Sequence, residues 1–186
     1  MHAHESASFA QPTAIISTLG IEPGMLALDV GAGSGHHTLA LARAVGGSGR
    51  VYALDVQPDL LRRIKNEAAL RGLSHVHTIH ADIEQEGGTR LKDGLLDFAL
   101  FSNILFQLEH AGSALGEARR VLKRSGRLAL IDWADSFGGM GPQRRDVISR
   151  DKALDIAREA GFEALRSFDA GGYHWGVLMR PATLLV

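Results

Sequence analysis

The sequence of 186 residues contains no cysteine. That absence excludes disulfide bonds, thiolate nucleophiles and zinc sites built on cysteine. An excess of charge of one sign is also lacking, because 20 Lys and Arg residues stand against 21 Asp and Glu residues, and the formal net charge is −1. No overall basic field is therefore present to attract nucleic acid or an anionic membrane, and we expect neither as a partner.

Long hydrophobic runs are absent as well. No apolar stretch approaches the roughly 20 residues that a membrane-spanning helix needs, and the opening "MHAHESASFA" lacks the apolar core of a secretion signal. With 45% hydrophobic residues, the chain can nevertheless build one full core. We therefore expect a cytoplasmic protein with a flexible tail over residues 1–10 and one folded domain over residues 11–186.

Apolar and polar segments alternate along the chain in a strand–helix pattern. Expected strands cover residues 25–30, 50–56, 75–82, 95–102 and 126–133. Expected helices cover residues 12–19, 36–45, 58–72, 104–124 and 149–161, and the segments 162–169 and 173–180 form a closing hairpin. This alternation predicts an α/β fold in which a mostly parallel sheet carries helices on both faces.

Basic residues gather near the end of the expected helix 104–124. They are Arg119, Arg120, Lys123, Arg124 and Arg127. Cations near the C-terminus of a helix interact favourably with its dipole. On a helix that ends near Gly126, we therefore interpret these residues as a solvated face and not as a nucleic-acid site.

The first expected strand is followed by glycine at every second position, Gly31, Gly33 and Gly35, and then by a helix. In an α/β sheet this turn lies at the carboxyl edge, where ligands bind. Glycine permits positive φ and lets a ligand lie against the main chain, while the helix start adds free N–H groups. The turn favours a nucleotide-like ligand, although a tight strand–helix turn alone would also explain it.

Three acids, Asp29, Asp55 and Asp82, stand at the ends of successive strands. Asp55 lies about 20 residues past the glycine turn, where an acid can accept both hydroxyls of a ribose. A ligand that reaches from the turn past Asp55 to Asp82 and Ile83 could comprise a carboxyl-bearing tail, a ribose and an adenine. A dinucleotide motif would need glycine where His36 stands, and no P-loop sequence follows.

The segments "LDVGAGSG", "VYALDV", "HADIE" and "GRLALIDW" resemble, in this order, the motifs of class I S-adenosylmethionine-dependent methyltransferases. The resemblance covers residues 12–182 and points to the ubiquinone/menaquinone C-methyltransferase-like group, a type 11-like methyltransferase domain. It implies a Rossmann-like, seven-stranded, mostly parallel sheet with an antiparallel last strand. It also implies S-adenosyl-L-methionine as the cofactor and S-adenosyl-L-homocysteine as its product.

The resemblance assigns cofactor contacts to positions of this sequence. Along the methionine part and near the sulfonium it places Asp29, Gly31, Gly33, Gly35, Ser102 and Asn103. On the ribose and the adenine it places Asp55, Val56, Asp82 and Ile83. Asp29 would steer the ammonium group, Asp55 would bind the ribose hydroxyls and Asp82 would bind the adenine amino group. The chain departs from the group at Phe106 and Gln107, where histidines are common.

Several kinds of methyltransferase do not fit the sequence. Cytosine C5 methylation needs a cysteine, and methylation of base amino groups usually goes with Asn/Asp-Pro-Pro-Tyr/Phe where this chain has "FSNI". Metal-dependent catechol-type enzymes carry Asn after the acid of strand five, whereas Asp132 is followed by Trp133, so we expect no metal site. His2 and His4 are interpreted as part of a mobile polar end.

Methyl transfer from a sulfonium depends mainly on positioning and exclusion of water, and a base helps where the acceptor carries a proton. We predict acceptor contacts at His36, Trp133 and Tyr173, with His174 as the base. Strand pleating would put Tyr173 and His174 on opposite faces, so only one of them would reach the acceptor. The leading hypothesis is a small-molecule methyltransferase. A protein or RNA methyltransferase and a non-catalytic S-adenosylmethionine-binding module are the alternatives, and a homodimer is compatible with the sequence.

Overall fold

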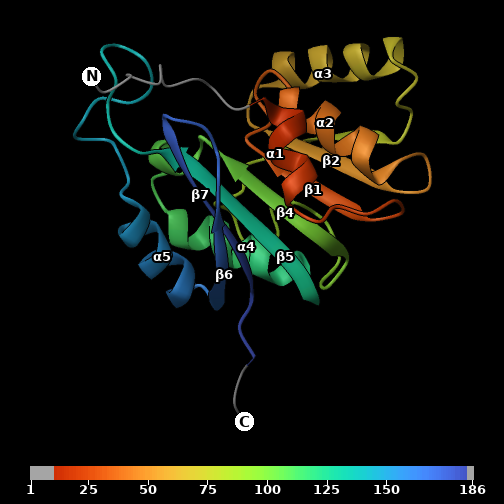
Figure 1. Cartoon of the computed structure of the whole chain (residues 1–186). Helices are drawn as coiled ribbons and strands as arrows, with labels where there is room; N and C mark the ends of the chain where they lie inside the picture. The colour runs from red at the N-terminus through yellow and green to blue at the C-terminus, as the bar shows by residue number, and fades with distance from the viewer. Residues whose placement is uncertain (1–10, 184–186) are drawn as a thin grey trace.

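The computed structural model describes residues 11–183 and contains one seven-stranded sheet (Figure 1). The strands are β1 (Leu26–Val30), β2 (Arg50–Asp55), β3 (Val76–His80), β4 (Leu96–Ser102), β5 (Leu122–Trp133), β6 (Phe162–Phe168) and β7 (His174–Pro181). Their order across the sheet is β3-β2-β1-β4-β5-β7-β6. Strands β1 to β5 are parallel, and β7 is antiparallel to β5 and β6. The predicted sheet with its antiparallel last strand is confirmed, while the predicted tail over residues 1–10, with His2 and His4, lies outside the described residues.

Helices cover both faces of the sheet. They are α1 (Pro12–Thr18), α2 (His36–Val45), α3 (Pro58–Leu70), α4 (Ala111–Val121) and α5 (Arg150–Glu159), with a 3-10 turn η1 (Leu105–Gln107). Figure 1 shows α1, α2 and α3 on one side of the sheet and α4 and α5 on the other. Alternate strand residues explain the two layers, since Ala27 packs with α1 and α2 while its neighbour Leu28 packs with α4 and α5. Within residues 11–183, no helix has the length and apolar character that crossing a membrane would require.

Several helix ends follow the local signals in the sequence. The Oγ atom of Ser149 accepts a hydrogen bond of 3.3 Å from the main-chain N–H of Lys152 and caps α5. Gly161 follows the end of α5 with a φ of +85°, a conformation that favours glycine. Pro12 and Pro58 each occupy the first turn of a helix, where the missing N–H costs no hydrogen bond.

The predicted single helix over residues 104–124 is wrong at its start. The chain makes only the short turn η1 after β4, and α4 begins at Ala111. Buried Asp132, at the end of β5, explains the break because its Oδ2 atom accepts a hydrogen bond of 3.0 Å from the N–H of Leu105. This bond ties the turn to the sheet, so Leu105 is buried and Leu108 is partly buried against the core without a continuous helix.

The same prediction is wrong at its end. Leu122 has an extended backbone, with φ −77° and ψ 138°, and it pairs with Leu96 of β4. Strand β5 therefore begins directly after α4, and not at Gly126 as predicted. The pairing register shifts between Leu96 and Phe98 of β4, because residues 123–126 of β5 lie opposite a single residue of β4 and form a bulge.

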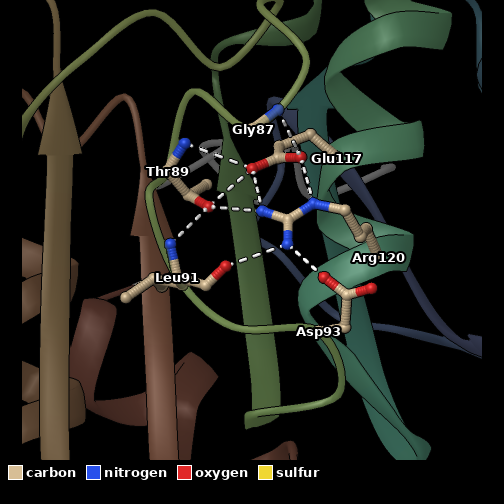
Figure 2. A network of polar contacts seen from close by, with 6 residues as sticks. All are labelled: Gly87, Thr89, Leu91, Asp93, Glu117 and Arg120. Atoms are coloured by element: carbon tan, nitrogen blue, oxygen red, sulfur yellow. Dashed lines mark hydrogen bonds and ion pairs between the residues drawn. The ribbon is translucent and has the colours of Figure 1, made fainter.

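The basic residues near the end of α4 do not form the predicted solvated helix face. Arg119 and Arg120 belong to the last turn of α4, whereas Lys123, Arg124 and Arg127 lie on β5. Figure 2 shows that Arg120 instead lies in a polar network with the buried Glu117. Its Nη2 atom donates to Glu117 Oε1 at 2.7 Å and to Thr89 Oγ1 at 3.2 Å, and its Nη1 atom donates to the carbonyl of Leu91 at 2.9 Å. This network anchors the loop between β3 and β4 on α4.

Candidate active site

Two cavities meet at the carboxyl edge of the parallel strands, beside the turn after β1. The first has a volume of about 440 Å3, and its lining includes the predicted residues Asp29, Gly31, Gly33, His36, Ser102, Asn103 and His174. The second has a volume of about 290 Å3, and its lining includes Gly31, Gly33, Asp55, Val56, Asp82 and Ile83. Gly31, Gly33 and Gln107 line both, so the two cavities are parts of one groove. The groove extends from the β3–β2 side of the sheet toward β5 and β7.

The glycine turn separates the two cavities and has a backbone that favours glycine. Gly31, Gly33 and Gly35 have φ values of +64°, +51° and +80°. A Cβ atom on Gly31 would lie 2.7 Å from Cδ1 of Ile104, and one on Gly35 would lie 2.6 Å from Cγ1 of Ile64. A Cβ atom on Gly33 would meet nothing closer than 3.8 Å, so that position borders open groove. Gly35 is not among the residues that line the two cavities and packs against Ile64 of α3, and its contact with the cofactor stays a prediction.

Asp29 lies on β1 at the bottom of the first cavity and is 2% exposed. Its Oδ2 atom accepts a hydrogen bond of 2.6 Å from the hydroxyl of Thr38, on the first turn of α2. Burial raises the pKa of Asp29 to about 7, although the hydrogen bonds from Thr38 favour the charged form. A cationic group that enters the first cavity would stabilise the ionised carboxylate.

Asp55 ends β2 and faces the second cavity. Its Oδ2 and Oδ1 atoms accept hydrogen bonds of 2.9 Å from the N–H groups of Gly33 and Gln57, respectively. A carboxylate oxygen has more than one acceptor position. Asp55 can therefore hold the glycine turn and still accept hydroxyl groups from a ligand in the second cavity.

The far end of the second cavity combines apolar surface with a further acid. Val56 is 59% exposed, which is unusual for a large apolar side chain, and Ile83 belongs to the buried core. Asp82 accepts a hydrogen bond of 2.9 Å from the N–H of Glu84, which fixes the turn after β3. Apolar surface beside a fixed carboxylate suits a flat ring that carries an amino group.

The segment after β4 contributes Ser102 and Asn103 to the first cavity. Asn103 has a φ of +57°, which is uncommon for a residue other than glycine. Its main-chain N–H donates to the carbonyl of Ile131 at 2.9 Å, which fixes the residue at the edge of the sheet. The Oδ1 atom of Asn103 is buried and has no hydrogen-bond partner among residues 11–183. An acceptor held in this way is suited to a ligand donor.

Three histidines line the first cavity, namely His36 and His37 at the start of α2 and His174 at the start of β7. His36 is exposed, and its Nδ1 atom lies 3.3 Å from the hydroxyl of Ser34. Burial lowers the pKa of His174. Burial also lowers the pKa of His37 to about 4, with further contributions from the neighbouring His36 and His174. Both His37 and His174 are therefore neutral near pH 7 and can accept a hydrogen bond or a proton.

Trp133 and Tyr173 lie behind this histidine cluster and are not among the residues that line the first cavity. The ring centroid of Trp133 lies 4.5 Å from that of His174, and the ring of Tyr173 packs edge-on against Phe137 at 5.0 Å. Gly141 approaches the indole so closely that a Cβ atom there would lie 2.5 Å from Cδ2 of Trp133. Trp133 therefore supports His174 and the loop after β5, and the contacts of Trp133 and Tyr173 with the acceptor stay predictions.

Sequence reasoning gave no role to three residues of the site. Thr38 binds the carboxylate of Asp29, and Gln107 lines both cavities while its Nε2 atom donates to the carbonyl of Asn103 at 2.8 Å. For His37, at the start of the first expected helix, the sequence left open whether the side chain faces the groove or the surface. The departure at Gln107 from the pattern of the resembled group was the available signal. Among the described residues, no group of three or more His, Asp or Glu side chains is arranged to hold a metal ion.

Comparison with known proteins agrees with this geometry. A family model described as a methyltransferase domain matches residues 21–161. The 2-phytyl-1,4-naphtoquinone methyltransferase of Trichormus variabilis is 33% identical over 119 residues, which are 63% of this chain and 51% of that protein. The demethylmenaquinone methyltransferase of Staphylococcus aureus is 30% identical over 118 residues, which are 63% of this chain and 47% of that protein. The chain therefore spans about half the length of these curated relatives.

A solved structure extends the likeness beyond the residues that the family model matches. The crystal structure of a SAM dependent methyltransferase from Aquifex aeolicus has a TM-score of 0.84 and 29% sequence identity to this chain. The alignment covers 94% of this chain and 90% of that chain. The overall architecture, and not only the glycine turn, is therefore shared.

Proposed function

This chain belongs to the methyltransferase-domain family, among the class I S-adenosylmethionine-dependent methyltransferases of the ubiquinone/menaquinone C-methyltransferase-like group, and from this premise we propose that it transfers a methyl group from S-adenosyl-L-methionine to a small-molecule acceptor. The observation that carries the proposal is the continuity of the two cavities across Gly31 and Gly33. One ligand can lie along this groove with its adenosine in the second cavity and its methionine part in the first. The rest of the first cavity is then left for the acceptor.

The chemistry of the groove suits this cofactor. The unpartnered Oδ1 atom of Asn103 and the buried carboxylate of Asp29 are acceptors for an ammonium group. Asp55 offers its remaining lone pairs to the ribose hydroxyls. The exposed side chain of Val56 gains an apolar partner when a flat ring covers it, and Asp82 lies at the same end of the groove.

When bound, S-adenosyl-L-methionine supplies a methyl group that is already activated on a sulfonium. The residues of the chain therefore have to orient the acceptor and exclude water, which the closely packed turn and the apolar wall of the first cavity favour. Where the attacked atom carries a proton, His174 accepts it, because burial keeps its imidazole neutral near pH 7. His36 lines the open side of the cavity, and Trp133 holds the ring of His174 in place.

The relatives support a small molecule as the acceptor, since two of them are named for methylation of a naphtoquinone and of demethylmenaquinone. The near-neutral charge of the chain gives no comparable support for a nucleic-acid substrate.

Calorimetry followed by a labelling experiment tests the proposal. We expect S-adenosyl-L-methionine and S-adenosyl-L-homocysteine to bind with micromolar affinity and NADH not to bind. The protein with methyl-labelled cofactor is then incubated with metabolite extract, RNA and protein fractions, and the label should appear in the metabolite fraction. Label in RNA or protein would contradict the acceptor class, and binding without any transfer would favour a non-catalytic module.

A further inference from the structure

The first cavity contains a buried polar atom to which the proposed position of the cofactor gives no role. The Nε2 atom of His37 is buried and has no hydrogen-bond partner among the described residues, and His37 lines this cavity. A buried polar atom is normally paired, so an unpaired one beside a cavity points to a ligand. The next residue, Thr38, is tied to Asp29 by a hydrogen bond of 2.6 Å, so this turn of α2 is fixed relative to β1.

The charge state of His37 makes it a hydrogen-bond acceptor. Burial is the main reason that its pKa falls to about 4, and His36 and His174 lower it further. A neutral imidazole carries one N–H and one free lone pair. A neutral ring also avoids repulsion with a sulfonium in the same cavity, whereas an imidazolium would oppose it.

The surroundings of the three histidines are apolar on the side away from the second cavity. Ile15 of α1, Ile131 of β5 and Ala170 of the β6–β7 connection line the first cavity and belong to one hydrophobic cluster. Ile131 and Ala170 lie on the β5–β7 side of the sheet, whereas the adenosine end of the groove lies over β2 and β3. A molecule that occupies this end therefore meets apolar carbon on one side and imidazole nitrogen on the other.

We infer that His37 binds the methyl acceptor through its Nε2 atom, and that the acceptor is an apolar molecule with an O–H or N–H donor that this atom recognises. The inference rests on the proposed function, because the acceptor is placed in the part of the first cavity that the cofactor leaves free. His37 and His174 then have separate tasks. His37 orients the acceptor through a hydrogen bond to a ring that stays neutral, and His174, which is half-buried, handles the proton.

Two probes of the same shape test the inference. Indole carries one N–H donor, and benzofuran has the same bicyclic shape without a donor. With the protein saturated by S-adenosyl-L-homocysteine, we expect indole to bind roughly 10-fold more tightly than benzofuran, the difference that one net hydrogen bond produces. The His37→Leu variant should bind the two probes equally, and His37→Gln should keep part of the preference. The control His77→Leu removes an exposed histidine on β3 and should keep all of it.

A second measurement does not depend on how a variant folds. In the wild-type protein, indole should shift the nitrogen resonance of the unprotonated Nε2 atom of His37, and benzofuran should not. Failure of indole to bind, or an equal preference for indole in His37→Leu and wild type, would overturn the inference while leaving the proposed function intact. Failure of S-adenosyl-L-homocysteine to bind the wild-type protein would instead overturn the proposed function, and this inference with it.

Discussion

The main-chain N–H of Gly33 donates a hydrogen bond of 2.9 Å to the carboxylate of Asp55, which ties the turn after β1 to the end of β2. The other oxygen of the same carboxylate accepts the N–H of Gln57 at 2.9 Å. Asp55 therefore stabilises the shape of the groove and also presents an anionic edge to it. A change at Asp55 should therefore weaken the binding of the cofactor more than it disturbs the rest of the fold.

The Asp55→Ala variant should bind S-adenosyl-L-methionine roughly 10- to 100-fold more weakly, because a hydrogen bond to a charged group contributes about 1.5–3 kcal/mol. Isothermal titration calorimetry measures the difference. Asp59→Ala is the control, since the side chain of Asp59 is 76% exposed and pairs with Arg62 on the surface of α3. Equal affinities of wild type and Asp55→Ala would refute the assignment of this carboxylate to the ribose.

The raised pKa of Asp29 leads to a pH dependence of cofactor binding. Because burial raises this pKa to about 7, the carboxyl group of the ligand-free protein is mostly protonated at pH 5.5 and increasingly ionised toward pH 7. An ammonium group favours the ionised form, so the affinity for S-adenosyl-L-homocysteine should rise over this range. In Asp29→Asn the affinity should be lower and should lose this slope. A slope that persists in the variant would show that another group is responsible.

Asp29 also affects the stability of the ligand-free protein. Its contribution to stability falls as the pH rises, whereas the affinity for the cofactor rises. A raised pKa in the folded state gives a contribution that is present below the ordinary pKa of an aspartate and is lost as the pH rises through about 7. Asp29→Asn keeps an oxygen for the hydroxyl of Thr38 but cannot ionise. We therefore expect its thermal midpoint to exceed that of the wild type at pH 8 and the advantage to shrink at pH 5, as calorimetric scans would show.

The polar network in Figure 2 predicts an acid-sensitive loss of stability. Burial opposes ionisation of Glu117, but hydrogen bonds from Arg120, Thr89 and Gly87 outweigh it and lower the pKa of Glu117 to about 2. Glu117→Gln removes this charge beside Arg120 and should lower the free energy of unfolding by about 2–3 kcal/mol at pH 7.

The pH at which this effect disappears follows from the sign of the shift. A lowered pKa stabilises the folded protein above the ordinary pKa of a glutamate, near 4.5, and the stabilisation is lost as the pH falls toward 2. The stabilities of wild type and Glu117→Gln, measured by urea titration, should therefore approach each other as the pH falls toward 2. Glu67→Gln, which breaks an exposed pair with Arg71, should change stability by less than about 0.5 kcal/mol at either pH. A large effect at Glu67 or none at Glu117 would contradict this account.

The parts of the fold that were predicted correctly depend on local signals. The burial of β1 on both faces, the prolines at the starts of α1 and α3 and the Ser149 cap act within a few residues of the chain. The meeting of the three acids at one groove was also predictable, because the carboxyl ends of parallel strands meet at one edge of a sheet. Asp29, Asp55 and Asp82 accordingly line the groove.

The errors have long-range causes. Leu105, Leu108 and Leu115 have helical spacing, but the hydrogen bond from Leu105 to Asp132 joins positions 27 residues apart and breaks the helix. Arg120 similarly finds its partners across a loop, at Leu91 and Asp93. The position of His37 Nε2, which has no hydrogen-bond partner among the described residues, depends on how α2 packs beside the first cavity. The hydrophobic periodicity of a segment indicates which of its faces is buried, but it does not indicate such distant polar partners.

His174 and Tyr173 are neighbours in the sequence, but the structure separates their roles. His174 lines the first cavity and packs against Trp133 with the two rings tilted, whereas Tyr173 packs against Phe137. Once the labelling experiment has identified an acceptor, His174→Ala should lower kcat by roughly 100-fold, the lower range of general-base catalysis. Its affinity for S-adenosyl-L-homocysteine should stay within a factor of about two, because the base touches the acceptor and not the cofactor.

Tyr173→Phe should turn over at nearly the wild-type rate, since it keeps the ring that contacts Phe137 and alters no residue that lines the cavity. Steady-state kinetics of the two variants decides the matter: a His174→Ala variant with wild-type kcat would remove the base from this position, and a large loss in Tyr173→Phe would move the acceptor to the other face of β7.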